Sequence, residues 1–182
     1  MVYIMLGKGF EETEAVAPGD VLRRAQIPMQ YVGIGGKVVE GAHGICLQAD
    51  ITLEEMDLEH MDMIVLPGGL GGVESIEASE GAMAAVKYAL DHDRYVAAIC
   101  AAPTILGKRG WLDGRHAVCY PGCEGGMGQA IVHPEKEAVV DGKLITGRAP
   151  GAAIEFGLTL AGMLPGEYTP DEIAGYMVYD RR

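Results

Sequence analysis

Four short apolar runs constrain the fold of this chain more than any other feature of the sequence. The runs are residues 2–6, 29–34, 61–66 and 95–99. Each is nearly continuous in apolar side chains, which is the pattern of β-strands that are covered on both faces. The segments 12–24 and 79–92 between them are typical of helices, and Ser79 is suited to cap the second one. This alternation predicts a doubly wound α/β domain with a mostly parallel central sheet.

The chain beyond these runs continues the same architecture. We expect a helix over 101–109, a hairpin over 138–146 and a last helix over 152–163. Asp141 and Gly142 supply the hairpin turn, because an Asp-Gly pair tolerates the positive φ of tight hairpin turns. The tail, 164–182, contains two prolines and has room for one short helix. Because repeats and low-complexity tracts are absent, the sequence predicts one domain over 1–182.

Charge and composition indicate which partners and which cellular compartment this protein can have. The 182-residue chain has 14 Lys and Arg against 26 Asp and Glu, a formal net charge of −12 at pH 7. Such an acidic surface repels phosphate backbones, so we expect no nucleic-acid partner. No stretch approaches the about 18 apolar residues of a membrane span, and the N-terminus carries no basic leader. We therefore expect a cytoplasmic protein without a membrane partner.

Cys100 ends an apolar strand within the segment AAICAAPTIL, residues 97–106. In a parallel sheet, ligands bind where the strands end and the following helices begin. Small neighbours such as Ala101 allow the sharp turn that lifts a nucleophile clear of the sheet, and a helix start lowers the pKa of a thiol. The alternative is a core cysteine that packs as a small hydrophobe, because the full G-x-C-x-G pattern is absent.

Two further segments open at the same sheet edge. LGKGFEETEAV (6–16) and VLPGGLGG (65–72) each follow an apolar strand. Glu14 in the first segment is either a partner for Cys100 or an ordinary solvated acid favoured by the helix dipole. The glycines of the second segment are either part of the site or a flexible turn. A phosphate cradle is a poorer interpretation, because neither GK[ST] nor G-x-G-x-x-G is completed.

Together with LITGRAPGAAIEFGLTL (144–160), these motifs resemble the ThiJ/PfpI superfamily, and within it the Parkinson-disease-protein deglycase branch. The resemblance covers residues 1–163 and leaves 164–182 as a C-terminal tail. It implies a flavodoxin-like three-layer sandwich, similar to class I glutamine amidotransferases, and a homodimer. It also implies a catalytic cysteine that is hydrogen-bonded to a protonated glutamate, without a cofactor.

Matched motif by motif, the resemblance assigns the catalytic pair to Cys100 and Glu14. It assigns an oxyanion site to the backbone N–H groups of Gly68, Gly69 and Ala101. The residues themselves support the pairing, because burial and a nearby thiolate push a carboxyl group toward its neutral form and let it exchange a proton.

Three more side chains are pocket candidates, and each has an alternative interpretation. Tyr120 stands where several family members have a histidine, and a tyrosine is a poor base near neutral pH. Arg148 matches a family arginine near the pocket but also reads as a surface charge at a hairpin exit. His43 lies in a segment that carries an arginine or histidine in relatives, and a turn residue is an equal alternative.

The remaining histidines and cysteines carry weaker signals. The spacing of the histidines does not suggest a metal site, so we expect no metal. Cys119 and Cys123 are interpreted as loop thiols. The His133 to Glu135 segment matches the amidotransferase pair only by chance, because it lies too close to Cys100 in sequence. A protease is also disfavoured, since its nucleophile would be followed by a histidine where this chain has alanine.

Two functions remain. The first is a glyoxalase III-like or deglycase-like enzyme that converts methylglyoxal or glyoxal to a 2-hydroxy acid, with small aldehydes or glycated side chains as its partners. The second is a redox-responsive stress protein or chaperone whose Cys100 is oxidised without turnover, since a low-pKa thiol at a helix start oxidises readily.

Overall fold

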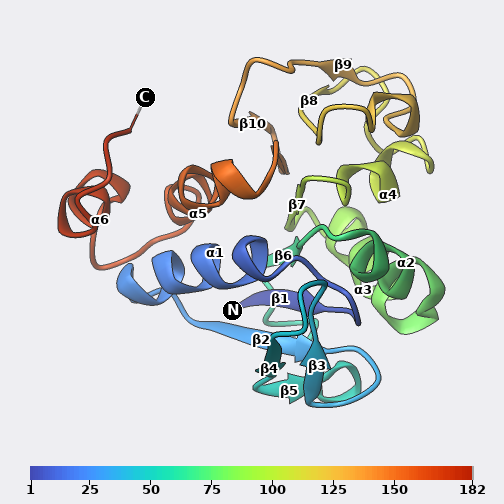
Figure 1. Cartoon of the computed structure of the whole chain (residues 1–182), viewed down its shortest axis with the longest axis horizontal. Coiled ribbons are helices and arrows are strands. Elements are labelled where there is room, and N and C mark those ends of the chain that lie inside the picture. The colour runs from blue at the N-terminus through green and yellow to red at the C-terminus, as the bar shows by residue number, and fades with distance from the viewer. Residues whose placement is uncertain (182) are drawn as a thin grey trace.

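A seven-stranded sheet forms the centre of the computed structural model, which describes residues 1–181 (Figure 1). In spatial order the strands are β10 (Ala138–Asp141), β11 (Leu144–Gly147), β7 (Tyr95–Ile99), β6 (Met63–Leu66), β1 (Val2–Leu6), β2 (Met29–Gly33) and β5 (Ile51–Thr52). All neighbours pair in parallel except β10 and β11, which form the antiparallel hairpin at one edge. The mostly parallel sheet is therefore confirmed.

Helices cover both faces of this sheet (Figure 1). One layer contains α1 (Glu12–Arg24), α5 (Ala153–Ala161) and α6 (Pro170–Tyr176). The other contains α2 (Leu70–Ala78), α3 (Glu80–Asp91) and α4 (Pro103–Gly107). The molecule is thus a flavodoxin-like three-layer sandwich, in which the strand ends lie between two helical layers.

The short strands lie outside the main sheet. β3 (Val38–Glu40) and β4 (Cys46–Gln48) pair antiparallel, and β8 (His116–Ala117) pairs in parallel with β9 (Ile131–Val132). Three single 3₁₀ turns cover Leu53–Glu55, Glu124–Gly126 and Pro150–Ala152. The sequence does not predict these elements, because runs of two or three residues carry no measurable periodicity.

The continuous apolar runs are explained by the two hydrophobic cores. In β1, Ile4 packs into the core beneath α1 and α5, whereas Tyr3 and Met5 pack into the core beneath α2 and α3. Because side chains alternate between the two faces of a strand, a strand with a core on each side needs apolar residues at every position.

Most predicted helices form, with two differences. Ser79 caps α3 by accepting a hydrogen bond from the Ala82 N–H (3.2 Å), as expected. The regular part of the predicted helix over 101–109 is only Pro103–Gly107, and turns follow it over residues 108–114. Helix α2 was missed, because its first residues belong to the glycine-rich segment that reads as a turn.

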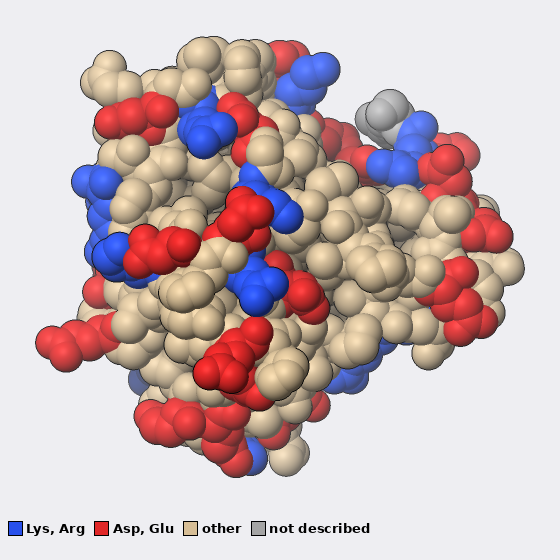
Figure 2. All heavy atoms as spheres, turned by 180° about the vertical axis from the view of Figure 1, so that it is seen from behind, with Lys and Arg blue, Asp and Glu red and all other residues tan. Residues whose placement is uncertain are grey.

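The surface carries interspersed charges. Figure 2 shows Lys and Arg side chains scattered among the more numerous Asp and Glu side chains on the face opposite to that of Figure 1. None of the helices within residues 1–181 combines the length and the apolar character that crossing a bilayer requires.

The contact between α1 and α5 depends on a glycine, which provides a test of the fold. A Cβ at Gly157 would lie 2.9 Å from the Pro18 Cα and 3.1 Å from the Val21 Cβ. We predict that Gly157→Ala lowers the free energy of unfolding by about 1–3 kcal/mol through overpacking, measured by urea denaturation.

The matched control is Gly175→Ala in α6, where a new Cβ would meet nothing within 4 Å. This substitution is expected to leave stability unchanged or to raise it by at most about 1 kcal/mol, because alanine favours the helix. Equal effects of the two substitutions would contradict the close packing of α1 against α5.

Candidate active site

Cys100 lies on a strained turn between β7 and α4. Its φ is +67°, a left-handed conformation that costs a residue with a Cβ about 1–2 kcal/mol. Two backbone hydrogen bonds hold the turn: the Cys100 N–H donates to the Gly147 oxygen (2.9 Å), and the Tyr120 N–H donates to the Cys100 oxygen (2.8 Å). The thiol residue is only 8% exposed. A strained turn between a strand and a helix is the backbone conformation that a nucleophile elbow has.

Glu14 reaches the thiol from the first turn of α1. Its side chain is fully buried, and its Oε2 accepts a hydrogen bond from the Gly68 N–H (2.8 Å). Its other oxygen, Oε1, is buried and has no nitrogen or oxygen partner among the described residues, and the side chain that hydrogen-bonds to this carboxyl group is Cys100. A buried carboxyl group beside a thiol can exchange a proton with it.

Gly68 lets the two side chains approach each other. A Cβ at this position would lie 2.6 Å from Glu14 Oε2 and 2.7 Å from the Cys100 Cβ. A side chain at Gly68 would therefore push the carboxyl and the thiol apart. The Gly68 N–H already binds Glu14, so it is not free for an oxyanion as predicted, and it orients the carboxyl group instead.

The environment of Glu14 favours its protonated form. Burial, together with the negative charge of Glu11, raises the pKa of this carboxyl from 4.5 to about 7. The Cys100 side chain and the Gly68 N–H act in the opposite direction. A carboxyl group with a pKa near neutrality can both accept and release a proton under physiological conditions.

The pKa of Cys100 is raised rather than lowered. Burial is the largest cause, and the charge and hydrogen bonding of Glu14 add to it, while the N–H groups of Ala101 and Gly69 act in the opposite direction. The expectation of a low thiol pKa at a helix start is therefore wrong for this resting state, because burial and Glu14 outweigh the N–H groups at the turn. The thiol and the carboxyl behave as a coupled pair that retains one proton above about pH 7.

A pocket of about 450 Å³ opens over Cys100. Its wall includes Leu70, Ala101, Tyr120, Cys123, Pro150 and Glu11. Of these, Glu11, Leu70, Cys123 and Pro150 were not among the predicted site residues. Glu11 could have been anticipated, because it directly precedes α1 in the same motif as Glu14. The others come from loops whose path the sequence does not reveal.

The structure places only one of the three pocket candidates, Tyr120, Arg148 and His43, beside Cys100. Tyr120 lines the pocket over Cys100 and is 46% exposed. Arg148 lines a different depression together with Glu135 and Glu155, so it does not line the pocket over Cys100.

His43 also lies outside the residues that line the Cys100 pocket, and it forms a pair with Glu12. Its Nδ1 lies 2.7 Å from Glu12 Oε2, and its backbone N–H donates to Glu12 Oε1 at 2.7 Å. The hydrogen bond with Glu12 raises the pKa of the His43 imidazole. Glu11, Glu12 and His43 have ligand atoms within 4.8 Å of one another. Their polar atoms are engaged, however, because the Glu14 N–H also donates to Glu11 Oε2.

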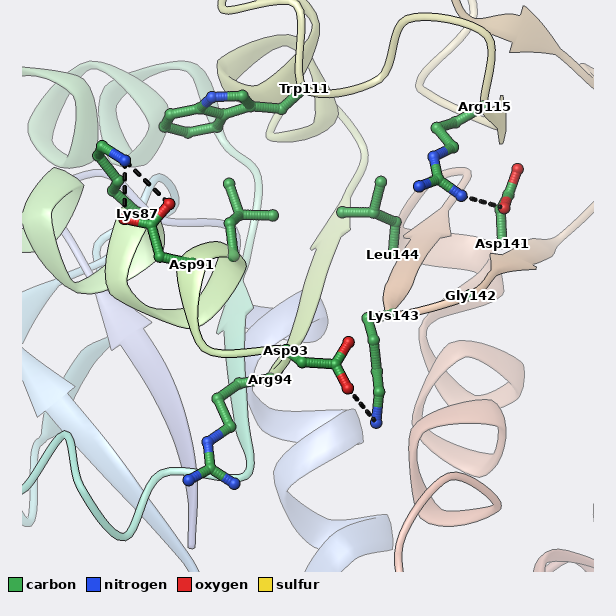
Figure 3. A pocket seen from close by; sticks show the side chains of 11 residues that line it. Lys87, Asp91, Asp93, Arg94, Trp111, Arg115, Asp141, Gly142, Lys143 and Leu144 are labelled. Atoms are coloured by element: carbon green, nitrogen blue, oxygen red, sulfur yellow. Dashed lines mark hydrogen bonds and ion pairs between the residues drawn. The ribbon is translucent and has the colours of Figure 1, made fainter.

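A second pocket, of about 400 Å³, lies away from the thiol, where β7 and β11 begin (Figure 3). Trp111 and Leu144 contribute apolar surface to it. Six of its charged side chains form ion pairs, namely Lys87–Asp91 (2.7 Å), Arg115–Asp141 (3.1 Å) and Lys143–Asp93 (4.0 Å), and Arg94 donates to the Glu59 backbone oxygen (3.4 Å). None of the predicted site residues lines this pocket.

The fold and the site together define a class of protein. A thiol on an elbow after a central parallel strand, facing a buried glutamate from the first helix, characterises α/β-sandwich proteins whose chemistry depends on one cysteine. The sequence matches the family model described as the DJ-1/PfpI family over residues 1–163. The chain therefore belongs to the DJ-1/PfpI family.

Individual relatives agree with this assignment. The chain is 35% identical over 173 residues to protein dj-1beta of Drosophila melanogaster, which covers 94% of this chain and 92% of the relative. It is 32% identical over 151 residues to a deglycase of Pyrococcus abyssi, covering 82% and 90%. The solved structure of oxidized DJ-1 from Toxoplasma gondii superposes with a TM-score of 0.92 at 31% identity, covering 99% and 98%.

The raised pKa of Glu14 predicts how stability depends on pH. The folded chain holds a proton on Glu14 between about pH 4.5 and 7, whereas the unfolded chain releases it. The contribution of Glu14 to stability is therefore fully present below about pH 4.5 and is lost as the pH rises through 7, by about 3 kcal/mol in total.

We predict that Glu14→Gln, which cannot ionise, gains stability relative to the unmodified protein as the pH rises from about 5 to about 8. Urea denaturation at several pH values measures this difference. Glu74→Gln, at an exposed position of α2, should show no such trend. Parallel stability curves for Glu14→Gln and the unmodified protein would show that Glu14 is ionised in the folded chain at all these pH values.

Proposed function

We propose that this protein is a cofactor-independent cysteine enzyme that converts reactive 1,2-dicarbonyls to 2-hydroxy acids. One observation carries the proposal: a fully buried carboxyl group with a pKa near 7 lies beside the elbow thiol, under an open pocket. That arrangement places a nucleophile and a proton carrier on the same small substrate.

The first step is addition of the thiol to the aldehyde. Because the pKa of Cys100 is raised, Glu14 removes the thiol proton as the sulfur attacks the aldehyde carbon. The carbonyl oxygen becomes an oxyanion that the N–H groups of Gly69 and Ala101 stabilise, since both point toward the sulfur. The proton then passes from Glu14 to this oxygen, and the product is a hemithioacetal.

The second step moves one proton between neighbouring carbons. Glu14 removes the C–H proton of the hemithioacetal carbon, which forms an enediolate, and returns it to the adjacent carbon, while the hydroxyl proton on the first oxygen moves to the second oxygen. The result is a thioester of the 2-hydroxy acid. Water then cleaves the thioester, releases the acid and restores the thiol, so methylglyoxal and water give lactate. The sequence of steps needs no external oxidant or reductant.

Protein deglycation uses the same first step on a carbonyl adduct of a side chain. The Pyrococcus abyssi relative is named a deglycase, which supports including this activity in the proposal. The homodimer and the cytoplasmic location expected from the sequence remain predictions.

We predict that Cys100→Ser abolishes lactate formation from methylglyoxal in the absence of glutathione, because the serine hydroxyl is a far weaker nucleophile. Glu14→Gln should lower turnover by on the order of 10²-fold or more, the usual scale for a lost general acid or base. Cys46→Ser, at an exposed thiol on β4, should retain full activity. Equal turnover in Cys100→Ser, or full activity in Glu14→Gln, would refute the mechanism.

A second candidate function is redox sensing at the same thiol. The solved structure of a relative from Toxoplasma gondii is described as oxidized, which favours this alternative. Two equivalents of peroxide would convert Cys100 to a sulfinate, and a protonated Glu14 could donate a hydrogen bond to one sulfinate oxygen.

Mass spectrometry after mild peroxide treatment separates the two functions. Uniform sulfinate at Cys100 in a protein that forms no lactate from methylglyoxal would establish the sensor. Turnover of methylglyoxal together with sparse oxidation of Cys100 would establish the enzyme. Exposed Cys46 reports the background oxidation of a thiol outside the pocket.

A further inference from the structure

We propose that Glu11 makes the Cys100 pocket selective by charge: it admits neutral and cationic carbonyl compounds and repels anionic ones such as 2-oxoaldehydes that carry a carboxylate. As a statement about substrates, this inference rests on the function proposed above. As a statement about the electrostatics of the pocket, it stands without turnover.

The lining of the pocket contains a single charged side chain. Within the described chain, the residues around Cys100 contribute glycine, alanine, leucine, proline, tyrosine and cysteine side chains, and only Glu11 carries a charge. An apolar wall excludes water, so a charge in it acts through a lower effective dielectric and is felt more strongly than on an open surface.

The Glu11 carboxylate is held in place. It is the N-cap of α1, where its Oε2 accepts the Glu14 N–H at 2.8 Å. Its own N–H donates to the Gly68 oxygen at 3.0 Å. Backbone and side chain are thus tied to the two elements that carry the site, and the charge cannot swing into solvent without uncapping α1.

Within residues 1–181, no cation forms an ion pair with Glu11. His43 is near, but its imidazole is paired with Glu12, so that pair adds no net positive charge. The field of Glu11 also reaches Glu14, whose pKa it raises. The pocket is therefore negative toward an incoming ligand.

The negative charge of Glu11 distinguishes dicarbonyl compounds by their own net charge. Methylglyoxal is neutral and meets no electrostatic barrier. A 2-oxoaldehyde with a carboxylate, such as 4,5-dioxopentanoate, is repelled. A methylglyoxal adduct on an arginine side chain that keeps its positive charge is attracted. For one fixed charge at a pocket wall, we expect rate ratios on the order of fivefold to tenfold.

Thiol reagents of different charge test the electrostatics without any turnover. Cys100 is modified with neutral methyl methanethiosulfonate, its trimethylammonium-ethyl analogue and its sulfonatoethyl analogue, and peptide mass spectrometry separates Cys100 from the other thiols. Dividing each charged-reagent rate by the neutral-reagent rate of the same variant cancels changes in the thiolate fraction. In the unmodified protein, the relative rate of the cationic reagent should exceed that of the anionic reagent. Glu11→Gln should reduce the quotient of these two relative rates, cationic over anionic, by on the order of tenfold.

Controls keep the result specific. Gln at position 11 retains an oxygen that can cap α1, so the fold is expected to persist. Glu74→Gln, an exposed charge on α2, should leave the quotient unchanged. In the unmodified protein, raising the salt concentration from about 20 mM to about 1 M should shrink the quotient, because the screening length falls to about 3 Å. An unchanged quotient in Glu11→Gln, or in high salt, would overturn the inference.

Measurements of turnover provide a second test of the charge selectivity. The ratio of kcat/KM for methylglyoxal over that for 4,5-dioxopentanoate should fall on the order of tenfold in Glu11→Gln. A protein that turns over neither compound but shows the charge-dependent labelling would refute the proposed function and retain the charge selectivity of the pocket. A protein that turns over both equally and labels without regard to charge would refute the selectivity and retain the function.

Discussion

The approach of the Glu14 carboxyl to the Cys100 thiol across Gly68 is the contact on which the rest of the site depends. It requires three chain segments to meet at one sheet edge: the loop from β1 to α1, the loop from β6 to α2, and the elbow after β7. Only a parallel sheet delivers three strand ends to the same place. The Gly68 N–H binds the carboxyl, and the missing side chain leaves room for the thiol.

This contact makes it unfavourable for either group to lose its proton. Two acidic groups share one enclosed space, so both cannot ionise, and burial moves the pKa of each upward. The opposing influences are the N–H groups of Ala101 and Gly69 at the sulfur, and the Cys100 side chain and the Gly68 N–H at the carboxyl. A pair that retains one proton is suited to passing that proton to a third group, whereas a permanently ionised thiolate would need no partner.

Strain and burial act together at the elbow. A cysteine at φ +67° is tolerated because its neighbours are small and its backbone is hydrogen-bonded to β11 and to Tyr120. These hydrogen bonds come from residues far along the chain. The alanines around Cys100 therefore predict a sharp turn from the sequence. The sequence does not predict the loop that carries Tyr120 and Cys123 over the thiol, and it does not predict that Arg148 and His43 lie outside that pocket.

The sequence by itself determined the alternation of buried strands and helices, the placement of Cys100 after β7, and the motif that contains Glu14. Local periodicity and small-residue patterns encode these features within a few turns of chain. Tertiary structure alone decided which N–H groups remain free, that Gly68 holds Glu14 rather than an oxyanion, and that the thiol pKa rises. Those properties depend on burial and on distances between segments more than fifty residues apart, such as the 54 residues between Glu14 and Gly68, which no local pattern contains.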